Sequence, residues 1–322
     1  MLGSTFIDNQ AIAGSGGHGN GTRILTVDVA TGGAIANDDG LHFAVGGCTF
    51  SHNEAIGGSN ATSDSGNLAQ GVGGAIVTEG VATITNSSFD HNLAEGGSGD
   101  TGGSGVVLNG RGIGGAIANF FQGASMSVGN CTFMDNQAVG GAGDSGGLVV
   151  GTGVGGGIDN ERGGAATVTD SCFIGNQAVG GAGAAGQNGA DGLGGAIANV
   201  LGVMLTVNGC TLTGNQALGG AGGTGANGGN GLGGGLFNDG VSIFPPNAGT
   251  PAGLTVTGTT ITENQATGGA ATGGGIAGQG VGGGVYLASG GVVCFDLFTS
   301  LNVTANTASA SDNDVFGVFT IC

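Results

Sequence analysis

The chain has 322 residues, of which 82 are glycine, 39% are hydrophobic and 7% are charged. Its 21 acidic residues face three arginines and no lysine, and this net charge of −18 argues against a nucleic acid or an anionic membrane as partner, because almost no cation can neutralise phosphate. No stretch approaches about 18 consecutive apolar residues, so we expect no membrane insertion by this segment.

The first element of the chain, residues 6–9, matches the end of a repeat unit whose beginning is missing. The opening "MLGSTFIDNQ" also lacks the basic region and the apolar run of a signal peptide. We therefore expect the chain to be a fragment, or a gene model that starts late, with room for an export signal upstream.

One sequence unit recurs along the whole chain. Each copy contains Asn-x-Ala, as in "CTFMDNQAVGGAG" from residue 131, and a "GGAI"-like segment precedes every copy after the first. Successive copies are 39 to 44 residues apart, except for one step of 49 residues that contains the insertion "FPPNAGTP". Such repetition indicates one solenoid. The repeated asparagines are Asn9, Asn53, Asn92, Asn136, Asn176, Asn215, Asn264 and Asn306.

Three short strands are predicted in each unit, typified by "GGAIAN", "ATVTD" and "CTFMDN". Residues alternate, so that Val168 and Phe173 point inward while Thr167 and Thr169 point outward. Strands of successive coils can pair at about 4.8 Å, and crossovers between parallel strands are right-handed as a rule. We predict an all-β, right-handed, single-stranded parallel β-helix of about eight coils over residues 1–293.

The repeated asparagines are predicted to form a structural turn ladder. Asparagine tolerates the left-handed backbone region, and its amide can bond to the amides one coil above and below. Glycine-rich loops such as "VGGAGAAGQNGADGL" follow each turn, and we expect them to protrude at one corner of the coil. The sequence leaves open whether these loops form an ordered fin or stay mobile.

The repeat pattern changes near the end of the chain. Residues 294–322 contain several phenylalanines and are predicted to form the last coil and a C-terminal cap. A disulfide between Cys294 and Cys322 is predicted across this cap. The other cysteines are expected to be free thiols, because the inward positions of Cys48, Cys131 and Cys210 are two coils apart and Cys172 is shifted by one residue.

These motifs resemble known repeats. The alternation of "GGAI" at 114 with "FMDN" at 133 and "FIGN" at 173 is similar to the repeats of bacterial polymorphic outer-membrane proteins and to glycine-rich members of the pectate-lyase-like right-handed β-helix superfamily. The resemblance implies an extracellular or cell-surface location. That superfamily holds lyases, hydrolases, adhesins and passenger domains, so the resemblance does not choose an activity.

A column of ionisable residues precedes the turn asparagines of four consecutive coils. It consists of Asp8, His52, His91 and Asp135, which would stack one strand spacing apart. Two imidazoles and two carboxylates can bind a metal or perform acid–base catalysis, and the alternative is a solvated polar ladder. The residues that we would assign to catalysis are His52, His91 and Asp135.

Loop aspartates are the candidates for calcium. Asp64, Asp100, Asp144 and Asp191 lie in glycine-rich loops whose carbonyl groups could complete a coordination shell. "GDSGG" around Ser145 matches the segment that holds the nucleophile of chymotrypsin-like proteases, but "GDTGG" occupies the same repeat position one unit earlier, so we interpret Ser145 as a loop residue. Arg111 and Arg162 show no clear acidic cluster in the sequence.

Outward hydroxyl columns are expected on the second strand of each unit. They consist of Thr83, Ser127, Thr167, Thr206 and Thr255, with Thr85, Thr169 and Thr257 beside them. The sequence favours a non-catalytic exported or cell-surface scaffold that is adhesive or contacts surface glycans or other cell-surface proteins. The alternatives are a polysaccharide lyase or glycoside hydrolase of the same fold and an ice-binding solenoid.

Overall fold

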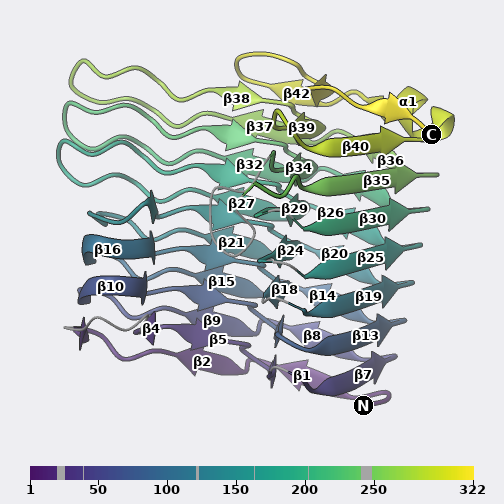
Figure 1. Ribbon diagram of the computed structural model, residues 1–322, viewed down its shortest axis with the longest axis horizontal. Helices are drawn as coiled ribbons and strands as arrows, with labels where there is room; N and C mark the ends of the chain where they lie inside the picture. Colours follow the sequence, from purple (N-terminus) through teal and green to yellow (C-terminus); the bar gives the residue numbers. More distant parts are fainter. Residues whose placement is uncertain (20–25, 39, 121–122, 163, 202, 241–248) are drawn as a thin grey trace.

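The computed structural model describes residues 1–19, 26–38, 40–120, 123–162, 164–201, 203–240 and 249–322. Most of the "FPPNAGTP" insertion lies outside the described residues. The described chain winds as a stack of coils, with the N-terminus in the first coil and the C-terminus at the opposite end (Figure 1). One short helix, α1 (Leu297–Leu301), interrupts the strands near the C-terminus. No described helix is long and apolar enough to cross a membrane.

Five parallel sheets, which we name E, F, A, B and C in chain order, run along the stack. Sheet E contains β5 (Ala30–Thr31), β11 (Gly71–Val72), β17 (Gly112–Ile113), β23 (Gly153–Val154), β28 (Gly192–Leu193), β33 (Gly231–Leu232) and β38 (Gly280–Val281). Sheet F contains β6 (Ile35–Asn37), β12 (Ile76–Thr78), β18 (Ile117–Phe120), β24 (Ile158–Glu161), β29 (Ile197–Asn199), β34 (Leu236–Asn238), β39 (Val285–Leu287) and β43 (Val315–Phe316).

Among these five sheets, sheet A has the longest strands. In each coil it precedes sheets B and C, and the turn lies between those two sheets. Sheet A contains β7 (His42–Gly46), β13 (Val81–Thr85), β19 (Ser125–Gly129), β25 (Ala165–Thr169), β30 (Met204–Asn208), β35 (Gly253–Thr257), β40 (Val292–Phe295) and β44 (Thr320–Ile321). Sheet B contains β1 (Thr5–Ile7), β8 (Thr49–Ser51), β14 (Ser88–Asp90), β20 (Thr132–Met134), β26 (Cys172–Ile174), β31 (Thr211–Thr213), β36 (Thr260–Thr262) and β41 (Val303–Thr304). Sheet C contains β2 (Gln10–Ile12), β9 (Glu54–Ile56), β15 (Leu93–Glu95), β21 (Gln137–Val139), β27 (Gln177–Val179), β32 (Gln216–Leu218), β37 (Gln265–Thr267) and β42 (Thr307–Ala308).

The predicted parallel β-helix is therefore confirmed, but the prediction of three strands in each coil was too low. The turn asparagine is followed by a further strand, such as β21, and a two-residue strand of sheet E precedes each glycine pair. Strands of two or three residues are too short to show alternation in the sequence. A sixth sheet, D, forms within the first glycine-rich loops from β3 (His18–Gly19), β4 (Thr26–Val27), β10 (Thr62–Leu68), β16 (Thr101–Asn109) and β22 (Val149–Val150).

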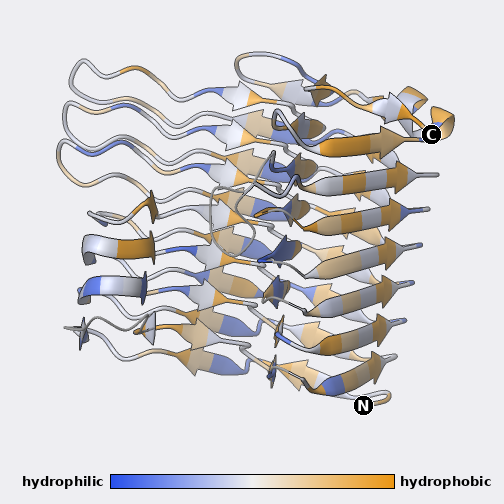
Figure 2. Cartoon of the chain, viewed as in Figure 1, coloured by the Kyte–Doolittle hydropathy of each residue, from blue (hydrophilic) through white to orange (hydrophobic). Residues whose placement is uncertain are grey.

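Like residues lie over like residues throughout the interior. Ile117 pairs in register with Ile158, and Ile158 with Ile197. The rings of Phe89, Phe133 and their neighbours form a continuous stack with centroids 4.6 to 4.8 Å apart. Figure 2 shows the matching alternation of orange and pale bands along the strands of sheet A. Burial of these side chains is the main stabilising contribution to a fold that has almost no helix.

A second apolar layer lies outside this core, between sheets E and F. Val72 of β11 and Val77 of β12 belong to one such cluster, and Val154 of β23 and Phe237 of β34 belong to another. The glycine pair between the two strands makes this contact possible, because Gly114 and its equivalents adopt a positive φ that places successive strands at a sharp angle. This outer layer surrounds the charged cluster described below.

The glycine-rich loops extend from one side of the stack (Figure 1) and are linked to one another by backbone hydrogen bonds. The N–H of Ala190 donates to Gly181 O within one loop, and the N–H of Gly220 donates to Ala190 O of the loop below. Gly229 and Gly220 continue the same pattern. The question that the sequence left open is thus answered in favour of an ordered fin.

The last coil is closed by residues that follow β40. Cys294 and Cys322 are joined by a disulfide, with their Cα atoms 5.8 Å apart. The ring of Phe319 stacks on that of Phe295 at 4.5 Å. Asp296 accepts a hydrogen bond from the backbone N–H of Thr299 and caps helix α1. The remaining cysteines are free thiols: Cys48, Cys131 and Cys210 are buried, and Cys172 is exposed.

Candidate functional site

The ionisable turn column is present in the structure at the corner between sheets B and C. Asp8, His52, His91 and Asp135 each adopt a positive φ of 51° to 55° directly before a turn asparagine. The rings of His52 and His91 stack at 5.2 Å with an interplanar angle of 6°. The column lies on the outer surface, because the asparagine that follows each residue turns toward the interior, where Asn53, Asn92 and Asn136 are fully buried.

A third group that the sequence analysis missed, Asp90, completes a cluster around His91. The Nδ1 atom of His91 lies 2.9 Å from Asp90 Oδ1, and its Nε2 atom lies 4.0 Å from Asp135 Oδ2. Within the described part of the chain, this is the one group of three or more His, Cys, Asp or Glu residues whose ligand atoms all lie within 4.8 Å of one another. Asp90 ends strand β14 at an outward position, where neighbouring coils have Ser51 and Met134.

The loop aspartates do not gather into one site. Asp100 and Asp144 are buried and lie in adjacent loops, where Asp144 Oδ1 accepts the backbone N–H of Asp100 at 2.9 Å. Asp191 instead accepts the N–H of Asn230 at 2.6 Å, and Asp64 is exposed on β10. The four calcium candidates therefore lie in separate loops, with Asp100 and Asp144 in contact, and calcium binding by these residues stays a prediction.

Burial perturbs both members of the Asp100–Asp144 pair. It raises the pKa of Asp100 to about 6 and that of Asp144 to about 7. The negative charge of Asp28 adds to the rise for Asp100, and the negative charge of Asp100 adds to the rise for Asp144. One Oδ2 atom on each residue is buried without a hydrogen-bond partner among the described residues. The arrangement favours at least one protonated carboxyl group at neutral pH.

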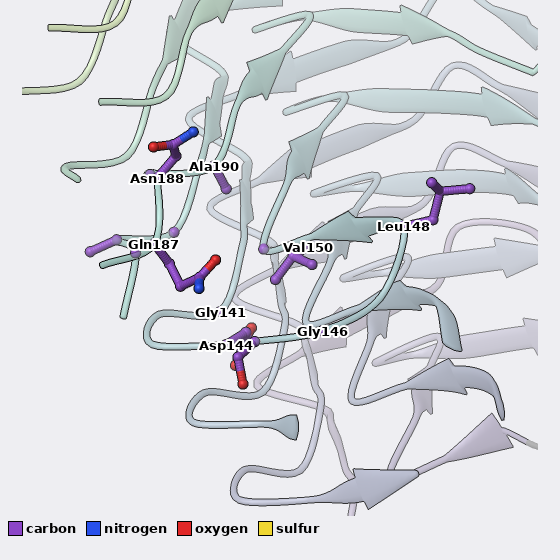
Figure 3. A pocket seen from close by; sticks show the side chains of 14 residues that line it. Gly141, Asp144, Gly146, Leu148, Val150, Gln187, Asn188 and Ala190 are labelled. Atoms are coloured by element: carbon purple, nitrogen blue, oxygen red, sulfur yellow. The ribbon is translucent and has the colours of Figure 1, made fainter. Parts of the chain in front are cut away.

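A cavity of about 330 Å³ lies beside Asp144, where the first loops meet the longer loops of the fin (Figure 3). Leu148, Gln187 and Asn188 contribute to its lining, together with several glycines. Ser145 also lines it, and its position opposite Thr101 follows the loop repeat. The structure thus places "GDSGG" in a stacked loop.

A buried ion-pair cluster, which the sequence analysis missed, lies in the outer apolar layer. Arg111 donates to Glu161 through two nitrogens, at 3.1 and 2.8 Å, and to Thr152 Oγ1 at 3.0 Å. Arg162 also bonds to Glu161, at 3.3 Å, and lies 5.0 Å from the centroid of the Phe120 ring. The expectation that Arg111 and Arg162 lack an acidic cluster was wrong, because Glu161, on β24, lies 50 residues after Arg111 in the sequence.

Asp159 belongs to the same cluster but has no ion-pair geometry of its own. Both of its carboxylate oxygens are buried and lack a hydrogen-bond partner within the described residues. Burial and the charge of Glu161 raise the pKa of Asp159 well above its usual value. Burial also acts to raise the pKa of Glu161, but the charges and hydrogen bonds of Arg111 outweigh it and hold that pKa below its usual value. The cluster can therefore keep one carboxyl neutral beside one that is ionised.

The signal for this cluster was present in the sequence. Where three other repeats read "GGAIAN", the fourth full repeat reads "GGGIDNER", which is the one repeat with a charged residue directly after the isoleucine-like position. Asp159 pairs in register with Ala118 and Ala198, so the carboxylate interrupts a column of alanines. A cavity of about 140 Å³ lies next to Arg111 and is lined by Thr152, Phe237 and other residues. Because the carboxylates themselves are fully buried, a large substrate has no direct access to them.

The outward hydroxyl columns are aligned across the coils. On sheet A, Thr83 pairs in register with Ser127, which pairs with Thr167, and the column continues through Thr206 to Thr255. On sheet B, a parallel column contains Thr49, Ser88 and Thr132. These side chains are exposed or half-buried, so sheet A presents a hydroxyl group at five consecutive coils, from Thr83 to Thr255.

No protein-family model, curated protein or solved structure matches the chain.

Proposed function

We propose that the chain is a non-catalytic scaffold that works outside the cytoplasm, at the cell surface or beyond it, and binds a neutral, hydroxyl-rich glycan on sheet A. The observation that carries this proposal is the column of hydroxyls from Thr83 to Thr255, which extends over five consecutive coils. A repetitive polymer can form equivalent hydrogen bonds with equally spaced hydroxyls, and each bond to a hydroxyl has modest strength, so many are needed.

The charge of the chain selects the class of glycan. With a net charge of −18, an acidic polysaccharide is repelled. Both arginines of the described residues, Arg111 and Arg162, bond to the buried Glu161 and so do not offset this repulsion at the surface. We therefore infer that the bound glycan is a neutral polymer. An acidic, pectate-like polymer is disfavoured, although the repeats resemble those of the pectate-lyase-like superfamily.

The proposed location outside the cytoplasm is supported by a disulfide bond. A disulfide joins Cys294 to Cys322, and stable disulfides form mainly in oxidising compartments such as the cell exterior and the bacterial periplasm. A surface or secreted role, with glycans or other cell-surface proteins as partners, agrees with this chemistry.

A binding assay with charge-matched variants tests the proposal. Thr167→Lys with Thr206→Lys places two long side chains in the centre of the hydroxyl column. Gln177→Lys with Gln216→Lys makes the same charge change in the same two coils, on sheet C. We expect the parent chain to be retained on insoluble cellulose or chitin, the sheet A variant to lose at least tenfold in retention, and the sheet C variant to behave as the parent.

Equal retention of both variants, or no retention of the parent on any neutral glycan, would contradict the proposal. The rival function, a polysaccharide lyase or hydrolase, predicts new chain ends when the protein is incubated with soluble polysaccharides. If His52→Ala with His91→Ala abolished such activity, the scaffold proposal would be wrong.

Ice is a second candidate ligand, because the same observation favours it. Thr167 with Thr169, and Thr255 with Thr257, present two hydroxyls side by side on sheet A, with Asn208 at the second position in the coil between them. A regular array of hydroxyl and methyl groups can also order water at an ice surface. Thermal hysteresis in the parent chain, lost in the variant with Thr167→Lys and Thr206→Lys, would favour ice over a glycan.

A further inference from the structure

His91 is held between two carboxylates on the outer surface of the stack. It belongs to the turn between β14 and β15, and Asp135 occupies the same turn position in the next coil. Asp90 precedes His91 directly at the end of β14. The imidazole remains accessible, since 51% of the His91 side chain is exposed.

The hydrogen bond to Asp90 fixes which ring nitrogen of His91 bears the hydrogen. A carboxylate only accepts hydrogen bonds, so the Nδ1–H of His91 donates to Asp90 Oδ1 over 2.9 Å. In the neutral ring, the lone pair is then on Nε2, the atom that faces Asp135. Carboxylates commonly orient metal-binding histidines in this way.

On the opposite side of the His91 ring, two potential metal ligands lie at a suitable distance from each other. His91 Nε2 and Asp135 Oδ2 are 4.0 Å apart, which is too long for a hydrogen bond. Bonds from zinc to imidazole nitrogen and carboxylate oxygen are about 2.0–2.2 Å long, so two ligands of one ion lie at most about 4.4 Å apart. One ion between these atoms therefore needs only a small movement of the side chains.

The neighbourhood is short of positive charge. The chain has no lysine, and both arginines of the described residues bond to Glu161 in the buried cluster. Asp90 and Asp135 therefore have no lysine or arginine partner in the described part of the chain. The ring of His52 covers one face of His91 at 5.2 Å and limits its rotation.

We propose that His91 Nε2 and the Asp135 carboxylate bind a divalent first-row transition-metal ion such as Zn²⁺, with Asp90 as the positioning residue. The nitrogen ligand disfavours Ca²⁺ and Mg²⁺, which prefer oxygen ligands alone. Water fills the remaining coordination positions of the ion. This site lies at the turn between sheets B and C, so it is independent of the glycan-binding face proposed on sheet A.

Isothermal titration with Zn²⁺ tests the site. The exposed thiol of Cys172 also attracts zinc, so Cys172→Ser is introduced into every protein, and no histidine tag is used. We expect one saturable site of micromolar affinity. His91→Ala and Asp135→Asn each weaken binding at least tenfold, and Asp90→Asn weakens it about tenfold through loss of ring orientation.

Two matched controls keep the test specific. His42→Ala removes another exposed imidazole, and Asp64→Asn removes another exposed carboxylate. Both should retain the parent affinity, and Ca²⁺ should give no saturable heat. In parallel, ¹⁵N spectra of the parent should show zinc-induced shifts at His91 Nε2. Absence of saturable zinc binding, or an unchanged affinity in His91→Ala or Asp135→Asn with circular dichroism like the parent's, would overturn the proposal.

Discussion

Asp100 and Asp144 lie at the same position of two adjacent glycine-rich loops, and the backbone N–H of Asp100 donates to Asp144 Oδ1 over 2.9 Å. Both carboxyl groups are buried, so the ionisation of each within the folded chain is opposed mainly by lost hydration. The protonation of this pair should therefore make the stability of the loops depend on pH.

Stability should fall as the pH rises through the range in which this pair ionises. An aspartate in an unfolded chain has a pKa near 3.9, whereas burial raises the pKa of Asp100 to about 6 and that of Asp144 to about 7. The stabilisation from the protonated pair is fully present below about pH 4 and is lost as the pH passes 6 and 7.

Thermal unfolding between pH 4.5 and pH 8 measures this effect. We expect the melting temperature to drop by roughly 5 °C over this range, and the double variant Asp100→Asn with Asp144→Asn to show a clearly smaller drop. Asp64→Asn, at an exposed position, controls for the removal of one negative charge. A pH profile that is the same in the parent and the double variant would show that the pair does not control stability.

The turn asparagines should each be far more important than an ordinary polar residue. Asn176 Oδ1 accepts from both the backbone N–H and the side chain of Asn136, and its amide donates to Asn215 Oδ1 and to Phe133 O. Asn176→Ala leaves several of these buried groups unpaired, and each unpaired group costs about 1–3 kcal/mol.

We therefore expect Asn176→Ala to lower the free energy of unfolding by about 3 kcal/mol or more, as measured by urea denaturation. Asn9→Ala is the matched control, because Asn9 is the first member of the ladder and its loss leaves fewer groups unpaired. If the two substitutions had equal effects, the ladder would not act as a continuous network.

The glycines of the fin allow the backbones of neighbouring loops to pack directly against one another, in addition to making the chain flexible. A Cβ atom at Gly220 would overlap the carbonyl oxygen of Gly181 in the neighbouring loop. Gly220→Ala should therefore separate the two loops, at a cost of about 1–3 kcal/mol typical of overpacking. Faster hydrogen exchange in residues 180–191 and 219–230 is the expected readout. Gly14→Ala, which has open space around its Cβ position, should leave exchange in these segments unchanged.

The residues that recur at fixed positions of the repeats predict the interior of each coil well. Ile158 and Phe173 recur at fixed positions of the unit and stack as the pattern requires, because parallel pairing in register brings like residues together. The same reasoning missed the short strands of sheet C, such as β21, because three residues between two tight turns show no period. It left the order of the loops open, since a high glycine content indicates flexibility unless the backbones pack directly on one another.

The charged groups were harder to predict for a different reason. Asp90 was missed because the turn column takes one residue from each coil, whereas Asp90 contacts His91 within its own coil. Arg111 and Glu161 are 50 residues apart and belong to different repeats, so no spacing within one repeat joins them. Only the three-dimensional arrangement of neighbouring coils brings these partners together.

Reduction of the Cys294–Cys322 disulfide should loosen the C-terminal cap. The bond closes a loop with a sequence separation of 28 residues, for which chain-entropy estimates give a stabilisation of about 3–4 kcal/mol. We expect Cys294→Ser with Cys322→Ser to lower the melting temperature and to increase proteolysis within residues 294–322. Cys172→Ser, at an exposed free thiol, should change neither property. Equal proteolysis of the double variant and the parent would mean that other contacts, such as the stacking of Phe319 on Phe295, close the cap without the disulfide.

Glu161 and Asp159 lie two residues apart on β24, yet their substitutions should have opposite effects on stability. Glu161→Gln removes the charge that pairs with Arg111 and leaves a buried guanidinium uncompensated, which costs about 3–5 kcal/mol. Asp159→Asn removes a carboxyl group whose oxygens have no hydrogen-bond partner in the described residues. Because burial raises the pKa of Asp159 well above that of an unfolded aspartate, about 3.9, the carboxyl group destabilises the fold increasingly as the pH rises, so Asp159→Asn should stabilise the fold more at pH 9 than at pH 5. Urea denaturation of both variants at these two pH values measures the difference, and a loss of stability in Asp159→Asn as large as that in Glu161→Gln would show that Asp159 is ionised and paired in the folded chain.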